Sequence, residues 1–237
     1  MKIINLMGKK GSGKTYTAGE LTKILLSEGY IIYNDTFASK LKNMIALYFG
    51  VRKNNFDDAI TNIDDIKTNT YNMLVNSGKK PEALVPLIEN IKNISKTIKS
   101  LIDKKDSRTL MQYIGTDIFR KGDEDYWTKN MRNKINNMPS ISLNSISGKY
   151  WNPQIDFVII SDCRFINEFK MLNSLDNIKT YNILIKGIEK EDDNDNHRSE
   201  KEIDEIAKTE KIEIFNNTND KTKFEESIKL LLKKITM

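Results

Sequence analysis

The stretch Gly8 to Thr15 reads GKKGSGKT and concentrates glycines, lysines and hydroxyl residues in one short segment. It fits the pattern G-x-x-x-x-G-K-[ST], in which glycines let the loop curl with its amide N–H groups pointing inward. We expect Lys14 to reach the β and γ phosphates of a nucleoside triphosphate and the Thr15 hydroxyl to bind Mg²⁺. The predicted nucleotide-binding residues are Gly8, Gly11, Ser12, Gly13, Lys14 and Thr15.

The surroundings of this loop distinguish it from a glycine-rich turn that matches the pattern by chance. An apolar run, Ile3 to Met7, predicts a strand before the loop, and Lys14 to Ser27 has the apolar spacing of a helix after it. The helix adds the positive end of its dipole to the loop amides. The motif leaves the fate of the phosphate open, because switches, motors and kinases share it.

A second apolar strand ends in a carboxylate at Asp162, the usual place for the residue that holds the magnesium shell beside a phosphate loop. The alternative for Asp162 is to cap the helix that begins near Phe165. Arg164 follows at the C-terminal edge of the sheet, where ligands of open α/β folds collect. A solvent-exposed arginine is the alternative there. Asn167 and Glu168 are expected to orient Arg164.

The charge pattern gives little support to a nucleic-acid partner. The net charge is +5 and the isoelectric point near 9.0, but 38 basic residues are interleaved with 33 acidic ones. We expect no specific nucleic acid, although a non-enzymatic nucleotide- or nucleic-acid-binding module stays an alternative. Lysine is the default cation of this composition, so each arginine is the better candidate for planar recognition of an anion. The arginines are Arg52, Arg108, Arg120, Arg132, Arg164 and Arg198.

Length and composition predict one globular domain. The chain has 237 residues, of which 38% are hydrophobic and 30% charged, and no apolar run approaches the roughly 20 residues that span a bilayer. No membrane role is therefore expected, and a cytoplasmic location is the default. The single cysteine, Cys163, excludes an internal disulfide.

Strand and helix patterns alternate along the chain and predict an α/β fold with a mainly parallel sheet and helices on both faces. Tyr30 to Tyr33, Ile155 to Ile160, Thr180 to Ile185 and Ile212 to Phe215 are the other expected strands. Residues 51–106 are polar with apolar residues at helical intervals, which predicts a helical insertion in a single domain over 1–237. Further helices are expected at Phe37 to Phe49, Ser107 to Lys121, Asp125 to Met138 and Lys221 to Ile235, with a loop from Pro139 to Pro153.

Several separated stretches together resemble the phage-type deoxynucleoside monophosphate kinases of the P-loop kinase superfamily, and SDCRFINE is the most specific of them. The stretches are GKKGSGKT at Gly8 to Thr15, FASKLK at Phe37 to Lys42, RTLMQYIGTD at Arg108 to Asp117, Tyr126-Trp127, SDCRFINE at Ser161 to Glu168, and HRSE at His197 to Glu200.

The resemblance implies a P-loop kinase fold and transfer of the γ-phosphoryl group of ATP to a deoxynucleoside monophosphate, with Mg²⁺, in the cytosol of a phage-infected or host cell. Lys14, Arg108 and Arg164 would be catalytic. By the same resemblance, the monophosphate pocket would be bordered by Phe37, Ala38 and Lys42, and the acceptor would be bound by Arg108, Gly115, Thr116, Asp117 and Trp127.

Two of these implied roles also have support from the residue types. Arg108, at the start of an expected helix, is suited to clamp a monophosphate, with a solvated surface arginine as the alternative. Trp127 offers an apolar plane to a base, and a core aromatic is an equal alternative.

The sequence departs from the family where a lid arginine is expected, because Lys186 stands at the end of the fourth strand and an acidic segment follows. Lys186 and Arg198 are the candidate lid cations, and His197 is expected to orient a helix. Thr15 also differs from several relatives, although it is the general choice in phosphate loops.

A P-loop kinase for another small acceptor, such as a nucleoside, is the nearest rival. Base preference, sugar preference and a homodimer stay open.

Overall fold

The computed structural model describes the backbone of residues 1–138, 143–144, 150–151, 154–187, 198–209, 212–218 and 220–236. The chain forms two compact units, which we call unit 1 (Met1–Phe37 with Thr128–Met237) and unit 2 (Ala38–Trp127). That they make up a single kinase domain stays a prediction. Within the described residues, no helix is both long enough and apolar enough to cross a membrane.

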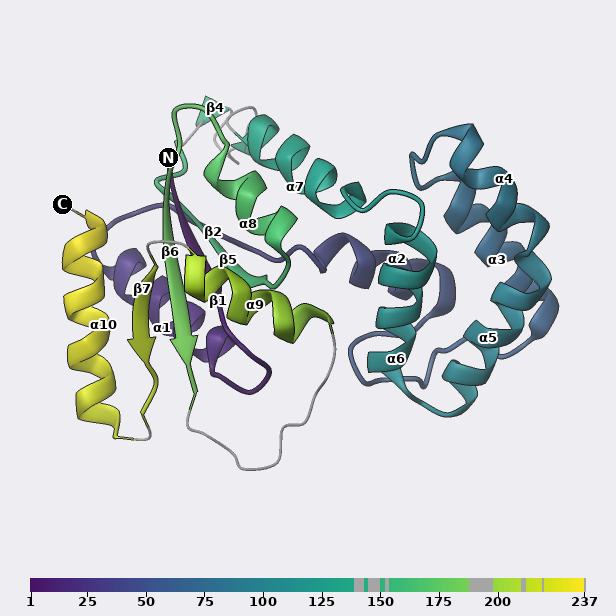
Figure 1. Ribbon diagram of the computed structural model, residues 1–237, viewed down its shortest axis with the longest axis horizontal. Helices are drawn as coiled ribbons and strands as arrows, with labels where there is room; N and C mark the ends of the chain where they lie inside the picture. The colour runs from purple at the N-terminus through teal and green to yellow at the C-terminus, as the bar shows by residue number, and fades with distance from the viewer. Residues whose placement is uncertain are drawn as a thin grey trace. The chain divides into compact units, whose positions relative to one another are not determined.

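Unit 1 contains a sheet whose five strands are all parallel, in the order β2-β5-β1-β6-β7 (Figure 1). The first strand of the chain is therefore at the centre of the sheet, flanked by strands that follow it much later. This confirms the predicted parallel sheet. The strands are β1 (Lys2–Met7), β2 (Ile32–Asp35), β5 (Phe157–Cys163), β6 (Lys179–Lys186) and β7 (Glu213–Asn216).

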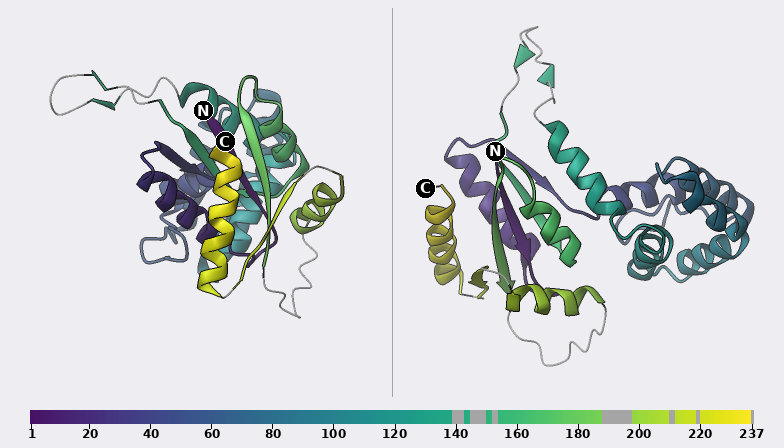
Figure 2. Two further views of the ribbon diagram at one scale, coloured as in Figure 1. Left: turned by 90° about the vertical axis from the view of Figure 1, so that its left-hand side faces the viewer. Right: turned by 45° about the horizontal axis from the view of Figure 1, so that its top comes forward.

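Helices cover both faces of this sheet because alternate residues of the buried strands point to opposite sides. In β1, Ile4 and Leu6 pack in one cluster with α1 (Lys14–Ser27) and α10 (Lys221–Thr236). Ile3 and Met7 pack in another with α7 (Tyr126–Asn137), α8 (Ile166–Asn173) and α9 (Arg198–Thr209). Figure 2 shows the sheet between helices in two further views. The predicted three-layer α/β class is confirmed.

The register of the sheet brings the carboxyl ends of the three central strands together. Met7, the last residue of β1, pairs with Cys163 of β5 on one side and with Leu184 of β6 on the other. The segments that follow these strands therefore emerge at one edge. This is the edge at which ligands of open α/β sheets bind.

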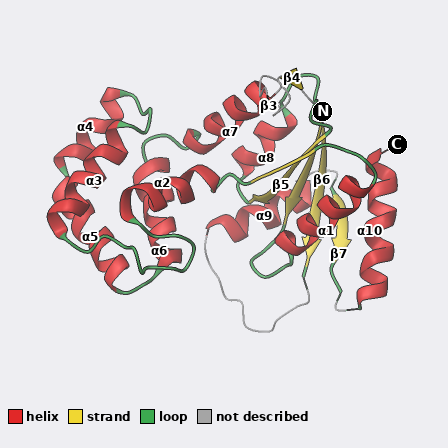
Figure 3. Ribbon diagram, turned by 180° about the vertical axis from the view of Figure 1, so that it is seen from behind, coloured by secondary structure: helices red, strands yellow, loops and turns green. Residues whose placement is uncertain are grey.

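Unit 2 is described throughout and contains helices without a β-strand (Figure 3). One hydrophobic cluster, which includes Phe49, Ile66, Ile98 and Phe119, forms its core. Most of the segment 51–106 is helical, as its apolar spacing indicates, although residues 51–62 form no helix. The elements are α2 (Ser39–Phe49), α3 (Ile63–Val75), α4 (Pro81–Glu89), α5 (Ile91–Asp103), α6 (Ser107–Gln112) and the π-helix η1 (Tyr113–Arg120).

The predicted elements differ from the structure at several points. The expected strand from Tyr30 begins at Ile32, because its pairing with β5 begins there. The single helix predicted from Ser107 changes to a π-helix at Tyr113, which helical periodicity alone does not reveal. In the expected loop 139–153, β3 (Leu143–Asn144) pairs antiparallel with β4 (Tyr150–Trp151), and the rest of that segment lies outside the described residues.

Candidate functional site

The phosphate-type loop joins β1 to α1 and depends on glycine at its two ends. Gly8 has φ 146° and Gly13 has φ 91°, backbone conformations that favour glycine. A Cβ atom at Gly8 would lie 2.5 Å from the carbonyl oxygen of Ile185 and 2.7 Å from Ser12 Oγ. The loop therefore packs against the end of β6 so closely that a side chain does not fit.

The ammonium of Lys14 is held inside this loop. Lys14 is 7% exposed, and its Nζ donates hydrogen bonds of 2.6 Å to the carbonyl oxygens of Gly8 and of Lys9. Helix α1 begins at Lys14 with no side-chain cap and no acidic residue in its first turn. No acidic side chain of the helix therefore occupies its first amides or the positive end of its dipole. Such a helix start is suited to bind an anion.

Asp162 lies in β5 near its carboxyl end and ties that strand to the segment after β2. Its Oδ1 accepts a hydrogen bond of 2.7 Å from the backbone N–H of Phe37. Asp162 is half-buried, and the following residue pairs with Met7 at the start of the phosphate loop. The structure thus brings Asp162 to the same sheet edge as Lys14 and Thr15.

The backbone at Arg164 is anchored by a buried carboxylate. Glu168 is 2% exposed, and its Oε2 accepts from the N–H groups of Arg164 at 2.9 Å and Phe165 at 3.2 Å. Phe165 is the N-cap of α8, and Glu168, at the third helical position, accepts from the N-cap N–H as the acidic residue of a capping box does. Glu168 therefore fixes the turn that carries Arg164, in agreement with its expected orienting role.

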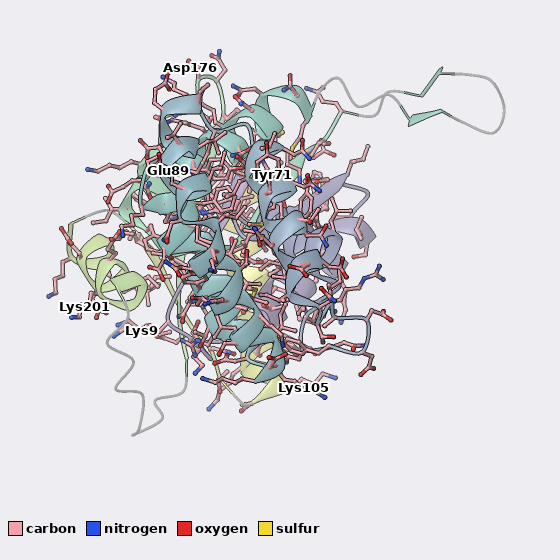
Figure 4. All side chains as sticks on the ribbon, turned by 90° about the vertical axis from the view of Figure 1, so that its right-hand side faces the viewer. Lys9, Tyr71, Glu89, Lys105, Asp176 and Lys201 are labelled. Carbon is pink, nitrogen blue, oxygen red and sulfur yellow. The ribbon has the colours of Figure 1, made fainter. Side chains whose placement is uncertain are left out.

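Helix α9 contacts both parts of this edge. Glu202 Oε2 accepts a hydrogen bond of 2.8 Å from the N–H of Ile166 at the start of α8. Asp204 pairs with Lys9 of the phosphate loop at 2.9 Å, and both side chains are about half exposed; Lys9 is labelled in Figure 4. An exposed ion pair of this kind contributes at most about 1 kcal/mol to stability. The pair between Lys9 and Asp204 therefore holds α9 on the phosphate loop only weakly.

The donors at this edge suit Mg²⁺ better than a metal that needs a full protein cage. Among the described residues, no group of three or more His, Cys, Asp or Glu side chains forms such a cage. Mg²⁺ commonly takes one or two protein oxygens together with water and substrate phosphates. Thr15 offers an exposed hydroxyl at the first turn of α1, and Asp162 offers a carboxylate. The donor set therefore fits the predicted ion.

In unit 2, Arg108 lies in the first turn of α6, as predicted. The residue is half-buried. Asp106 caps this helix by accepting from the N–H of Thr109 at 3.0 Å. Hydrogen bonds from Thr109 hold the pKa of Asp106 below its usual value, and the charge of Arg108 adds to the effect. The cap thus fixes the short turn from which the guanidinium of Arg108 extends.

The segment Gly115 to Asp117 lies in the π-helix η1, a form of helix often found at functional sites. Gly115 is buried, Thr116 half-buried and Asp117 exposed. A Cβ at Gly115 would lie 2.8 Å from Leu41 Cδ2, so η1 and α2 pack closely. Unit 2 therefore brings Leu41 of the FASKLK segment against Gly115 of the RTLMQYIGTD segment.

Trp127 occupies the position of a core aromatic. It is 5% exposed, its Nε1 donates a hydrogen bond of 3.0 Å to the carbonyl oxygen of Gly115, and its ring packs against Phe119 and Tyr126. A contact with the acceptor base stays a prediction. The structure shows that Trp127 holds the π-helix in place.

Replacing Trp127 by Phe should lower the free energy of unfolding by about 1–3 kcal/mol, because the Gly115 carbonyl loses its indole donor and the smaller ring fills less space. Equilibrium urea denaturation measures this loss. Tyr71→Phe, at an exposed aromatic of α3 labelled in Figure 4, is the control and should change little. Unchanged stability combined with a raised KM for the acceptor would favour the base-binding role over the core role.

The residues of the FASKLK segment have different environments. Phe37 is 5% exposed in the core of unit 1, whereas in unit 2 Ala38 is half-buried and Lys42 exposed. Lys40, which sequence reasoning passed over, has its Nζ 5.0 Å from the centre of the Tyr126 ring. Burial lowers the pKa of Lys40. Its placement on an aromatic face of unit 2 was not visible from the spacing of lysines.

A family model described as deoxynucleotide monophosphate kinase matches residues 52–226, about three quarters of the chain. The chain belongs to the deoxynucleotide monophosphate kinase family. This kinase is a phosphotransferase that uses a nucleotide phosphoryl donor and small nucleotide substrates, as predicted. The matched range begins after the phosphate loop, so the loop motif supports nucleotide binding independently of the family match. A comparison with curated proteins found no match.

The candidate lid cations of this kinase are only partly described. Lys186 is exposed at the end of β6, next to Ile185, whose carbonyl oxygen packs on the phosphate loop. Arg198 begins α9, but its side chain lies outside the described residues, as does His197 altogether. The acidic segment 189–196 also lies outside them.

Two residues that pack on the phosphate loop were missed by sequence reasoning. A Cβ at Gly187 would lie 2.7 Å from Ser12 Cα, and Asn217 Nδ2 donates a hydrogen bond of 3.0 Å to the carbonyl oxygen of Ser12. Gly187 follows β6, which pairs with β1, and Asn217 follows β7, which pairs with β6. Their positions after strand ends were the only signal, and many loop residues share it.

Proposed function

We propose that this kinase transfers the γ-phosphoryl group of ATP to a deoxynucleoside monophosphate, giving a deoxynucleoside diphosphate and ADP. The observation that carries the proposal is the buried ammonium of Lys14, held within a glycine loop at the uncapped start of α1. In a chain of this kinase family, such a loop is suited to the phosphates of the donor.

The residues proposed for the donor lie in unit 1. Lys14 and the loop amides neutralise the β and γ phosphates, and Thr15 and Asp162 hold the metal. A bound Mg²⁺ would offset the negative charge of the donor phosphates. An oxygen of the acceptor phosphate attacks the γ phosphorus, and the bond to the β–γ bridging oxygen breaks, so that oxygen leaves with ADP. Arg164, on its anchored turn, neutralises charge at the transferring group.

The residues proposed for the acceptor lie mainly in unit 2. Arg108 clamps the acceptor phosphate, because a guanidinium presents paired donors that match phosphate oxygens. Its place in the first turn of a capped helix keeps the backbone that carries the guanidinium ordered before binding. The other proposed acceptor residues are Phe37, Ala38, Lys42, Gly115, Thr116, Asp117 and Trp127.

Replacing Arg108 by Ala should raise the KM for the deoxynucleoside monophosphate about 100-fold, since two charge-assisted hydrogen bonds are lost. The KM for ATP should change less than about threefold, because the donor residues lie elsewhere in the chain. A coupled ADP-release assay, with ATP and Mg²⁺ against a panel of deoxynucleoside and ribonucleoside monophosphates, measures both constants.

Arg52→Ala is the matched control, because Arg52 is an exposed arginine of the same unit. It should leave both constants unchanged. Equal kinetics for wild type and Arg108→Ala would exclude Arg108 as the phosphate clamp. If nucleosides offered as acceptors in the same assay are turned over and monophosphates are not, the rival acceptor class is established, since a nucleoside has no phosphate for Arg108 to bind.

A further inference from the structure

The outer side of the phosphate loop is bonded to a residue more than 200 positions away in the sequence. Asn217, directly after β7, donates from Nδ2 to the carbonyl oxygen of Ser12 at 3.0 Å. Its own backbone N–H donates to the carbonyl oxygen of Lys186 at 2.8 Å, which continues the pairing of β6 with β7. Asn217 is therefore fixed by the sheet at its backbone while its side chain contacts the loop.

The fit between Asn217 and the loop is tight. A Cβ built on Gly13 would lie 2.1 Å from Asn217 Nδ2, a distance that real Cβ atoms essentially never show. Ser12 is 4% exposed, and Gly187 presses on its Cα from the end of β6. Glycine is favoured at position 13 by its positive φ, and the Asn217 side chain occupies the space in which a Cβ would lie.

The turn that contains Asn217 does not depend on its side chain. Thr218 Oγ1 accepts from the N–H of Asp220 at 3.1 Å, and Asp220 Oδ1 accepts from the N–H groups of Thr222 and Lys223 at the start of α10. The turn and the helix cap are therefore made by Thr218 and Asp220. The side chain of Asn217 is directed instead at the phosphate loop.

The carbonyl of Ser12 and the N–H of Gly13 belong to one peptide group. A trans peptide is planar, so its C=O and N–H point in opposite directions. A hydrogen bond that holds the Ser12 oxygen toward Asn217 therefore holds the Gly13 N–H away from Asn217. Gly13 precedes the first residue of α1, where loop amides meet phosphate in this type of loop.

We propose that Asn217 is a positioning residue of the phosphate loop, which orients the Ser12–Gly13 peptide so that the Gly13 N–H binds a donor phosphate. The proposal rests on the proposed function of the loop as the ATP site. Because Asn217 acts through the loop, it sets the affinity for the donor and leaves acceptor binding unchanged.

The test compares Asn217→Ala and Asn217→Asp with the wild type. Ala removes the hydrogen bond, and Asp keeps the shape but places a carboxylate against the Ser12 carbonyl and near the phosphates. Titration calorimetry with ATP and Mg²⁺, without acceptor, should give an affinity about tenfold lower for Ala and lower still for Asp. In steady-state assays the KM for ATP should rise in the same order while the KM for the monophosphate stays constant.

Asn216→Ala and Asn216→Asp are the matched controls, because Asn216 is an exposed neighbour at the end of β7. They should bind ATP like the wild type. Equal ATP affinity for wild type and both Asn217 variants would overturn the proposal. A loss of thermal stability in the Asn217 variants, accompanied by equal rises in the KM for ATP and for the monophosphate, would also overturn it, because that result indicates a general structural role. If wild type binds ATP but turns over no monophosphate, the proposed function fails, while the order of ATP affinities still tests Asn217.

Discussion

Replacing Lys14 by Met should lower kcat about 100- to 1,000-fold while the protein stays folded. The methionine side chain has nearly the length of lysine but carries no charge. The ammonium it replaces is buried within the loop and fixed by the carbonyl oxygens of Gly8 and Lys9. The Lys14 ammonium is already in place before the reaction, so it can stabilise the negative charge of the transition state without a rearrangement of the loop. Its loss should therefore lower kcat more than it changes substrate binding.

The assay is the ADP-release measurement at saturating ATP and monophosphate. The matched control is Lys23→Met on the same helix, because Lys23 is exposed and pairs with Glu20 at 2.6 Å on the surface. Circular dichroism of both variants establishes that α1 and the sheet are intact. A Lys14→Met enzyme that retains more than about a tenth of wild-type kcat would contradict the proposed role of the ammonium.

Asp162→Asn should lower kcat about 100-fold and raise the Mg²⁺ concentration needed for half-maximal activity, with little change in stability. The amide oxygen of Asn still accepts the hydrogen bond that Asp162 Oδ1 receives from the Phe37 N–H at 2.7 Å. The charge that would hold the metal shell is lost. The variant thus separates the structural role of Asp162 from its proposed metal role.

Two comparisons make this result specific. Asp162→Ala also removes the acceptor of the Phe37 N–H. It should therefore lower the free energy of unfolding by a further amount of about 1–3 kcal/mol, the cost of an unpaired donor, as measured by urea denaturation. Asp156→Asn is the matched control, since Asp156 Oδ2 accepts a similar bond of 2.8 Å from the Ile31 N–H at the opposite end of β5. It should leave the Mg²⁺ dependence unchanged. An unaltered Mg²⁺ dependence in Asp162→Asn would remove Asp162 from the metal site.

The elements predicted best are those whose ends have local signals. Helix α1 runs from Lys14 to Ser27 as predicted, because Gly13 precedes it and Gly29, at φ 88°, follows it. Helix α10 differs from its prediction by one residue at its end. Strand β5 reaches Cys163, three residues beyond the apolar run that predicted it, because Met7 of β1 provides a pairing partner there.

The π-helix was predicted as an ordinary helix for a definite reason. Its apolar residues keep a helical spacing, so the pattern indicates a helix but not the number of residues in each turn. The contacts that accompany it are tertiary, since the Gly115 carbonyl accepts from Trp127 and the Gly115 backbone packs against Leu41. Neither partner is adjacent in sequence.

The sequence by itself determined the phosphate-loop motif and the parallel α/β class, because both depend on contiguous residues and on local periodicity. Only the tertiary structure decided which distant residues surround that loop. Asn217 and Gly187 contact the loop, and Asp162 lies at the same sheet edge, because the strand order β2-β5-β1-β6-β7 places the ends of β5 and β6 beside the end of β1, with β7 next to β6. Strand order follows from the packing of both sheet faces, and no local pattern of residues records it.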